Sequence, residues 1–262
     1  MESYGNSIKG FEITRIENGE VRTVRDSVVT EFSLALYIGG RHLVNLLCSS
    51  GDLDALVYGY LFTERIIRRK SELISLTIRE DVAEAELTVE PDFGVVRTIT
   101  SGLGPQRTSA YHSMQVSDIR LADDFYLPAD ELLDNLSAFN TESALFTATG
   151  GVHSCALHNR NGKRIFMEDI GRHNAFDKAL GRALMEDWEI SQAYLLTSGR
   201  VPGYMVVKAL HTGLPIVVSR SAPTDRAVEL ARNGNMTLCG FARGRRMNVY
   251  SAPQRILTGY SV

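Results

Sequence analysis

Serine, glycine, histidine and arginine recur in five short segments of the C-terminal half, each placed where a predicted strand ends. Glycine lets the backbone approach a ligand, serine and threonine donate hydroxyl hydrogen bonds, and arginine binds phosphate with two donors at once. In an α/β sheet, ligands bind beyond the carboxyl ends of the strands, beside the amino ends of helices. These residue types therefore predict a site for a phosphate-bearing ligand. The segments are 149–151, 168–174, 198–200, 219–224 and 241–246.

The arginines of these segments favour a ligand over helix capping alone. Any single segment of this composition can serve only to cap a helix. The formal net charge of the chain is −3, however, and the arginines are expected along one rim of this acidic protein. A mildly acidic chain has no general attraction for nucleic acid or anionic membranes, so the anion site must be local. The arginines are Arg172, Arg200, Arg220, Arg243, Arg245 and Arg246.

Two histidines leave a choice between acid–base chemistry and a structural role. Asp169 and His173 are four residues apart, so a first helical turn could bring the carboxylate to orient the imidazole. The alternative is that Asp169 caps the helix and His173 is a buried residue, and His153 has the same ambiguity. Neither pattern resembles a zinc site, since the chain lacks HxE followed by PCxxC. We expect no metal bound by protein side chains.

The three cysteines, Cys48, Cys155 and Cys239, read as small buried hydrophobic residues rather than nucleophiles, because their neighbours in predicted strands are apolar. Their odd number, their wide spacing and the lack of a CxxC pair suit a reducing compartment. No stretch approaches the roughly 20 apolar residues of a spanning helix, and the sequence shows no secretory leader pattern. We therefore expect a soluble cytoplasmic protein that contacts neither membrane nor nucleic acid.

The N-terminal half reads as a smaller, β-rich part. Apolar and polar residues alternate on both sides of Gly39-Gly40, which predicts a β-hairpin. Leucine, valine and tyrosine then recur at helical spacing after the cap candidates in 49–52. The expected elements are a hairpin over 28–47, a helix over 53–65, strands near 73–79 and 82–90, and an irregular loop over 98–106.

The C-terminal half alternates strands and helices, which predicts an α/β fold with parallel strands and right-handed crossovers. Runs such as Leu214 to Val218 are apolar on both faces, as a buried central strand requires. The expected elements are a helix over 128–140, strands near 152–158 and 163–168, a helix over 174–187, strand 193–197 with helix 203–212, strand 215–219 with helix 224–232, and strands near 236–241 and 247–250.

Two strings of the C-terminal half are highly specific, EDIGRHNAFDK at 168–178 and SRSAPT at 219–224. With four further stretches they resemble the formate dehydrogenase accessory sulfurtransferase family (FdhD-type), and the resemblance covers most of the chain. It implies a homodimer whose subunits have a cytidine-deaminase-like α/β core, a mixed sheet covered by helices without the deaminase zinc. We expect a smaller β-rich N-terminal domain over 1–125 and the core over 126–262. The matching stretches are 52–67, 149–157, 168–181, 198–210, 213–232 and 238–256.

The resemblance also implies a task. Such proteins are thought to receive sulfur from a cysteine desulfurase as a persulfide and to pass it to the molybdenum bis(molybdopterin guanine dinucleotide) cofactor. They support insertion of that cofactor into the catalytic subunit of formate dehydrogenase. In the family, the cofactor contact segment falls on Phe241, Ala242, Arg243, Gly244, Arg245 and Arg246. Further expected contacts are His153, Asp169, Arg172, His173, Ser198, Arg200, Ser219, Arg220 and Ser221.

Three positions depart from the family pattern. The persulfide loop aligns with Ser101, Gly102, Leu103 and Gly104, where Leu103 occupies the place of the cysteine. Tyr204 stands where relatives commonly have glutamate, and Arg65 replaces a usual glycine.

Three functions follow from these departures. The first is an accessory protein that binds the molybdenum cofactor and acts in its sulfuration, with Cys48, Cys155, Cys239 or a partner supplying the sulfur. The second is a cofactor carrier or chaperone without sulfur transfer, because leucine cannot form a persulfide. A remote third is a zinc-dependent deaminase, which the missing zinc ligands disfavour.

Overall fold

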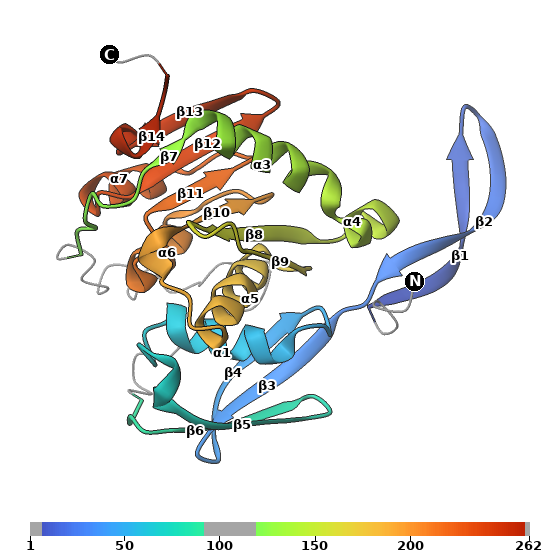
Figure 1. The fold of residues 1–262 in the computed structure, drawn as a ribbon. Helices are drawn as coiled ribbons and strands as arrows, with labels where there is room; N and C mark the ends of the chain where they lie inside the picture. The colour runs from blue at the N-terminus through green and yellow to red at the C-terminus, as the bar shows by residue number, and fades with distance from the viewer. Residues whose placement is uncertain (1–6, 92–118, 260–262) are drawn as a thin grey trace.

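The computed structural model describes residues 7–91 and 119–259 (Figure 1). The expected loop over 98–106, with Ser101, Gly102, Leu103 and Gly104, lies outside the described residues. The chain forms a mixed α/β structure in which a six-stranded sheet and a four-stranded sheet lie on either side of a pair of helices (Figure 1).

A mixed six-stranded sheet is built by the C-terminal half, in the order β13-β12-β11-β10-β8-β9. Its strands β10, β11 and β12 run parallel, whereas β8, β9 and β13 pair antiparallel with their neighbours. The strands are β8 (His153–Asn159), β9 (Arg164–Asp169), β10 (Ala193–Thr197), β11 (Ile216–Ser219), β12 (Thr237–Arg243) and β13 (Arg246–Ser251).

Helices cover both faces of this sheet because its central strands are apolar on both faces. Leu195 of β10 belongs to the core cluster shared with α5, α6 and α7. Its neighbours Tyr194 and Leu196 belong to a second cluster, which includes the buried leucines of α3. The helices are α3 (Ala129–Glu142), α5 (Arg172–Met185), α6 (Gly203–Thr212) and α7 (Asp225–Asn233).

The N-terminal half contributes a four-stranded sheet in the order β4-β3-β6-β5 and the helix α1. Gly39 and Gly40 form the predicted hairpin turn with φ of 54° and 75°, a conformation that glycine adopts at little cost. The described chain also contains short 3-10 helices and a pair of two-residue strands. The elements are β3 (Phe32–Ile38), β4 (Arg41–Cys48), α1 (Leu53–Thr63), η1 (Lys70–Glu72), β5 (Leu73–Arg79), β6 (Val82–Leu87), β7 (Leu127–Pro128), η2 (Ile190–Gln192), η3 (Pro253–Arg255) and β14 (Ile256–Leu257).

Glycines let α1 and α5 pack in close contact between the two sheets. A Cβ atom on Gly181 of α5 would lie 1.9 Å from the carbonyl oxygen of Ala55 in α1. A Cβ atom on Gly59 would likewise lie 1.8 Å from the carbonyl oxygen of Asp177. The two helices therefore approach to backbone contact, and one continuous hydrophobic cluster joins the N-terminal and C-terminal sheets.

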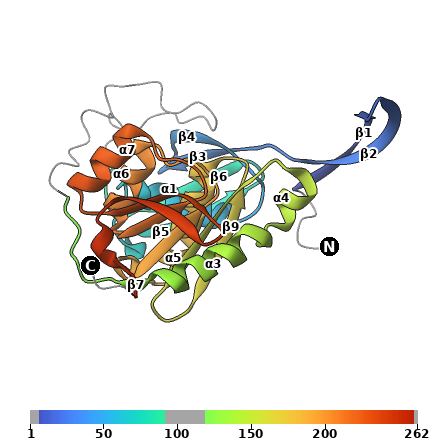
Figure 2. The same ribbon diagram turned by 90° about the horizontal axis from the view of Figure 1, so that it is seen from above.

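The order and type of the elements in 31–91 and 151–251 follow the sequence predictions, with boundaries shifted by a few residues. Besides the two-residue strands and the 3-10 helices, the sequence did not predict the hairpin of β1 (Ile8–Glu17) and β2 (Glu20–Val29) or the short helix α4 (Ala144–Thr149). The hairpin projects from the body as an arm (Figures 1 and 2). It takes up Val28 and Val29, so the start of the predicted 28–47 hairpin was wrong.

Arg65 has an unusual backbone conformation just after the end of α1. Helix α1 ends at Thr63, before the predicted limit, and Arg65 follows it with a φ of 60°. Only glycine adopts this left-handed conformation without steric cost, so an arginine here is strained by about 1 kcal/mol. A glycine at position 65 would relieve this strain in the backbone after α1.

Candidate functional site

The topology of the six-stranded sheet brings the predicted segments to one end of its strands. The strand β8 is antiparallel to both β9 and β10, so its first residue, His153, pairs with Asp169 at the end of β9. The turn after β11 pairs with its neighbours on both sides: a bridge joins Val201 to Pro223, and the Phe241 N–H donates to the Ser221 carbonyl over 2.9 Å. The carboxyl ends of β9, β10, β11 and β12 thus surround the start of β8.

A cleft of about 740 Å³ lies at this end of the strands. The strand ends supply the polar part of its lining, and the last turn of α3 and the helix α4 supply aromatic and small residues. Its volume is in the range of sites for small molecules. From the predicted site residues, the cleft brings together His153, Ser198, Arg220, Ser221 and Arg243.

Two arginines give the cleft its positive charge. Arg220 follows β11 and Arg243 ends β12, and neither has an acidic partner in the part of the chain that the structure describes. The Nε of Arg243 donates to the Arg220 carbonyl over 3.2 Å, which holds the two residues together. Ser219 is fully buried, and its Oγ donates to the Gly199 carbonyl over 2.7 Å and accepts from the Ser221 N–H over 2.9 Å. Ser219 therefore shapes the turn, while the arginines line the cleft.

The predicted contact segment 241–246 spans the end of β12, a two-residue turn and the start of β13. Phe241, Ala242 and Arg243 belong to β12 and Arg246 begins β13, so the turn itself is only Gly244 and Arg245. Phe241 is 42% exposed and has a φ of 51°, whereas Ala242 is buried in the core. The strand β12 therefore extends two residues beyond the predicted end at 241.

Arg245 is the one member of that segment with acidic partners in the described chain. Its guanidinium pairs with Asp134 over 2.9 Å and with Asp130, both on α3. Since these three side chains are exposed, the pairs contribute little to stability. Their charges nevertheless compensate Arg245, which separates it from Arg220 and Arg243.

His153 lies beside the backbone of Gly199 at the inner end of the cleft. Its Nδ1 is 3.5 Å from Ser198 Oγ, which also accepts a hydrogen bond from the Ser154 N–H over 3.0 Å. Burial lowers the pKa of His153, and the Arg172 guanidinium lowers it further. The imidazole is therefore neutral near pH 7. A Cβ on Gly199 would lie 3.0 Å from Arg172 Cβ, so glycine allows this close approach.

Arg172 opens α5 and carries a charge that the described residues do not fully satisfy. Burial lowers its pKa, and the neighbouring Arg200 lowers it further. Its Nε is buried without a hydrogen-bond partner among the described residues. Helix α5 has no acidic residue in its first turn and no side chain capping it, so this end of the helix is also positive.

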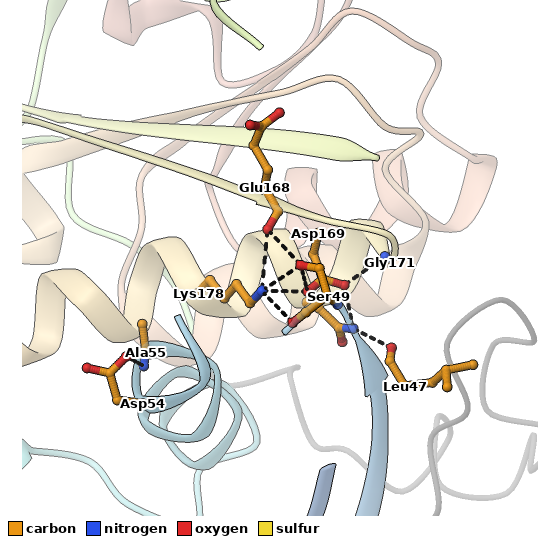
Figure 3. Close-up of polar contacts among 9 residues, drawn as sticks. Leu47, Ser49, Asp54, Ala55, Glu168, Asp169, Gly171 and Lys178 are labelled. Atoms are coloured by element: carbon orange, nitrogen blue, oxygen red, sulfur yellow. Dashed lines mark hydrogen bonds and ion pairs between the residues drawn. The ribbon is translucent and has the colours of Figure 1, made fainter. Parts of the chain in front are cut away.

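Asp169 lies at the centre of a buried polar cluster (Figure 3). Its carboxylate pairs with Lys178 Nζ over 2.7 Å, and both side chains are fully buried. It also accepts hydrogen bonds from the Ser49 N–H and Oγ, both over 3.0 Å, the Gly171 N–H over 2.9 Å and Asn174 Nδ2 over 2.9 Å. Asp169 thus ties the end of β4 to the start of α5 and does not bind the His173 imidazole.

His173 packs edge-on against Tyr204, with ring centroids 5.9 Å apart. Burial lowers the pKa of His173 to about 3, and the Lys208 ammonium contributes, so the imidazole is neutral. Its buried Nε2 has no hydrogen-bond partner among the described residues. The spacing of Asp169 and His173 therefore does not produce an acid–base pair, and the buried, structural alternative describes Asp169.

Tyr204 takes part in a second buried cluster. Its hydroxyl donates to Glu64, which also pairs with Lys208 Nζ over 3.1 Å. Lys208 Nζ lies 2.5 Å from the Asp177 carboxylate, where burial raises the pKa to about 6. Glu64, which sequence reasoning missed, thus supplies a carboxylate to this buried cluster.

Sequence reasoning also missed the part of the cleft that α3 and α4 supply. Phe139, Phe146 and the backbone of Gly150 and Gly151 line the cleft from this side. The signal was present, because Ser143 caps the start of α4 and Gly150 ends it with a φ of 67°. A six-residue helix is too short for a periodic pattern to reveal.

A family model described as the FdhD/NarQ family matches residues 29–257. The protein named sulfur carrier protein FdhD from Listeria innocua is 34% identical over 253 residues, which cover 94% of this chain and 97% of that protein. The chain belongs to the FdhD/NarQ family. The FdhD protein of Bacillus subtilis is 33% identical over 253 residues, covering 94% and 96% of the two chains.

A solved structure has the same fold as this FdhD/NarQ member. It is the crystal structure of a putative formate dehydrogenase accessory protein from Desulfotalea psychrophila, with a TM-score of 0.78 and 25% identity. The match covers 95% of this chain and 99% of that one. The resemblance seen in the sequence motifs is thereby confirmed, and with it a mixed α/β fold.

All three cysteines of this FdhD/NarQ chain are buried, as predicted from their apolar neighbours. Burial raises the pKa of each thiol to about 12, and the Asp169 carboxylate adds to the shift at Cys48. The thiolate is the nucleophilic form, so none of the three thiols is activated.

The described residues include no group of three or more His, Cys, Asp or Glu side chains placed to hold a metal ion. They also include no helix long and apolar enough to cross a membrane.

Proposed function

We propose that this chain is an accessory protein of formate dehydrogenase that binds the molybdenum bis(molybdopterin guanine dinucleotide) cofactor through its nucleotide phosphates. The observation that carries the proposal is the pair Arg220 and Arg243 in the cleft, which lack acidic partners in the described chain although the protein is acidic overall. Charged hydrogen bonds from guanidinium to phosphate are among the strong ones. The similar solved structure, named as a putative formate dehydrogenase accessory protein, supports the accessory role.

The residues present fit one nucleotide arm of this client. A volume of about 740 Å³ accommodates a nucleotide but not the whole two-armed cofactor. Arg220 and Arg243 neutralise the phosphates, and Ser198 and Ser221 add hydroxyl groups to the same lining. Phe241, Ala242, Gly244 and Arg246 stay proposed contacts from the family resemblance.

Neighbouring basic groups extend the proposed site beyond the cleft lining. His153 lines the cleft, Arg172 and Arg200 lie next to it, and Ser219 holds the turn that carries Arg220. We propose that Asp169 and His173 do not touch the client. Asp169 holds the start of α5 through the Gly171 N–H, and His173 packs against Tyr204.

In the proposed task, the protein supports sulfuration of the cofactor and its insertion into the formate dehydrogenase catalytic subunit, with a cysteine desulfurase as sulfur donor. We place this work in the cytoplasm and expect a homodimer. We further propose that 126–262 is a deaminase-like core joined to a smaller domain over 1–125. The central parallel strands β10, β11 and β12 support this assignment.

A titration with GDP, a stand-in for one arm of the cofactor, tests the proposed binding. We expect saturable binding by calorimetry that weakens as salt rises from about 50 to 500 mM, because salt screens the attraction between arginine and phosphate. The matched control is guanosine, which lacks the phosphates and is expected to bind much more weakly. Equal affinity for GDP and guanosine would contradict the proposal.

Burial of the cysteines favours a second function, a cofactor carrier without sulfur transfer. In a transfer, an acceptor thiolate attacks the terminal sulfur of the desulfurase persulfide, forms a new S–S bond and releases the desulfurase cysteine as thiolate. Cys48, Cys155 and Cys239 are buried and protonated, and Leu103 cannot replace them.

We therefore expect no sulfur adduct when the folded protein is incubated with cysteine desulfurase and cysteine. Intact mass spectrometry measures the result, with the urea-unfolded protein as the control for thiol reactivity. A gain of one sulfur atom on the folded chain would instead support direct transfer through one of its own thiols.

A further inference from the structure

Phe146 is an exposed aromatic residue inside the cleft rather than on the open surface. It lines the cleft beside Thr147, and 51% of its surface is exposed. A single exposed aromatic residue needs no explanation when it is scattered over a surface. One that forms part of a concave, charged cleft is placed to meet a ligand.

The helix that carries Phe146 is fixed on several sides. Ser143 Oγ accepts a hydrogen bond from the Phe146 N–H over 2.9 Å, and it donates to the Glu168 carboxylate of β9. Leu145, the preceding residue, is buried, so the next side chain along the helix points about 100° away from the core contact. At the other end, the Gly150 N–H donates to the Phe146 carbonyl over 2.7 Å. Phe146 therefore sits on a short but anchored support.

The cleft combines two chemistries that one nucleotide also combines. Arg220 and Arg243 match phosphate, whereas Phe146 offers apolar ring surface. Stacking on an aromatic side chain accepts a planar base without requiring a hydrogen-bond pattern. A phosphate site alone would not need the exposed aromatic ring, and a site for an apolar ring alone would not need the two arginines.

We infer that Phe146 is a ring-binding residue, on which the guanine base of the nucleotide stacks while its phosphates meet Arg220 and Arg243. The inference rests on the proposed binding of a nucleotide-bearing cofactor and adds the base-recognition part of the site. A guanine base fits better than a protein or lipid partner, because the aromatic residue and the arginines share one bounded cleft.

Two probes separate ring binding from phosphate binding. We expect Phe146→Ala to lower the affinity for GDP about tenfold by calorimetry, since base stacking on aromatic residues contributes on that scale. The affinity for inorganic pyrophosphate, which has no ring, is expected to stay unchanged. Phe146→Tyr keeps the ring and is expected to retain GDP affinity within about twofold. The thermal midpoint of each variant shows that the fold is intact.

Several results would overturn the inference. Unchanged GDP affinity in Phe146→Ala would place the base elsewhere, and an equal loss for GDP and pyrophosphate would mean that Phe146 only shapes the cleft. If Phe146→Ala lost binding of neopterin but kept GDP affinity, the stacked ring would be the pterin. Failure of the wild-type protein to bind either phosphate ligand would instead refute the proposed function itself.

Discussion

Replacing Lys178 with methionine is expected to lower the free energy of unfolding by about 3–5 kcal/mol. The ammonium group compensates the fully buried Asp169 carboxylate at 2.7 Å and also donates to Ser49 Oγ over 3.0 Å. Its removal leaves a negative charge in the core, where solvation cannot stabilise it. Urea denaturation followed by circular dichroism measures the change.

An exposed ion pair on the same protein provides the control for Lys178→Met. Lys70 pairs with Asp187 over 2.9 Å, and both side chains are open to solvent. Lys70→Met is therefore expected to cost less than about 1 kcal/mol. The double variant Asp169→Asn, Lys178→Met removes both charges and is expected to be more stable than Lys178→Met alone. If Lys178→Met were as stable as the wild type, the Asp169–Lys178 pair would not stabilise the fold and the expectation would be wrong.

Replacing both Arg220 and Arg243 with alanine is expected to weaken GDP binding about 100-fold or more. Each guanidinium can form a charged hydrogen bond with phosphate, and each such bond contributes about 1.5–3 kcal/mol. Neither arginine has a competing carboxylate in the described chain, so the full positive charge is available to the ligand. Calorimetric titration of the variant and the wild type measures the difference.

Arg245 is the matched control for this experiment, because it lies in the same basic segment but is already paired with Asp130 and Asp134. We expect Arg245→Ala to change GDP affinity less than about threefold. If Arg245→Ala weakened binding as much as the double variant, the ligand would lie over the turn at α3 and not in the cleft. Comparing these variants tests the distinction that sequence alone did not make among the arginines.

The fold was predictable where burial imposes a period on the sequence. Leu195 and Val217 lie in strands with every residue buried, and continuous apolar runs identify such strands. The β1–β2 arm escaped because Phe11, Ile16 and Val21 are exposed, so neither face of the hairpin has the one-sided pattern of a half-buried strand.

The site was predictable to the extent that topology determines it. Carboxyl ends of neighbouring strands must meet, so the convergence of Ser198, Arg220 and Arg243 on one cleft could be expected before the structure. Pairing between side chains was not predictable, because the spacing of Asp169 and His173 carries no information about Lys178 and Ser49. Ser49 lies 120 residues before Asp169 in the sequence, and Lys178 lies on a different element, the helix α5.

Amide hydrogen exchange with and without GDP tests the central claim most directly, because it reports where along the chain the ligand binds. We predict that GDP slows exchange in the segments 143–154, 198–200 and 219–243, which together line or support the cleft. The four-stranded sheet over 32–87 should exchange at the same rate in both samples. GDP protection confined to that sheet, or absent from the three cleft segments at saturating GDP, would contradict the account.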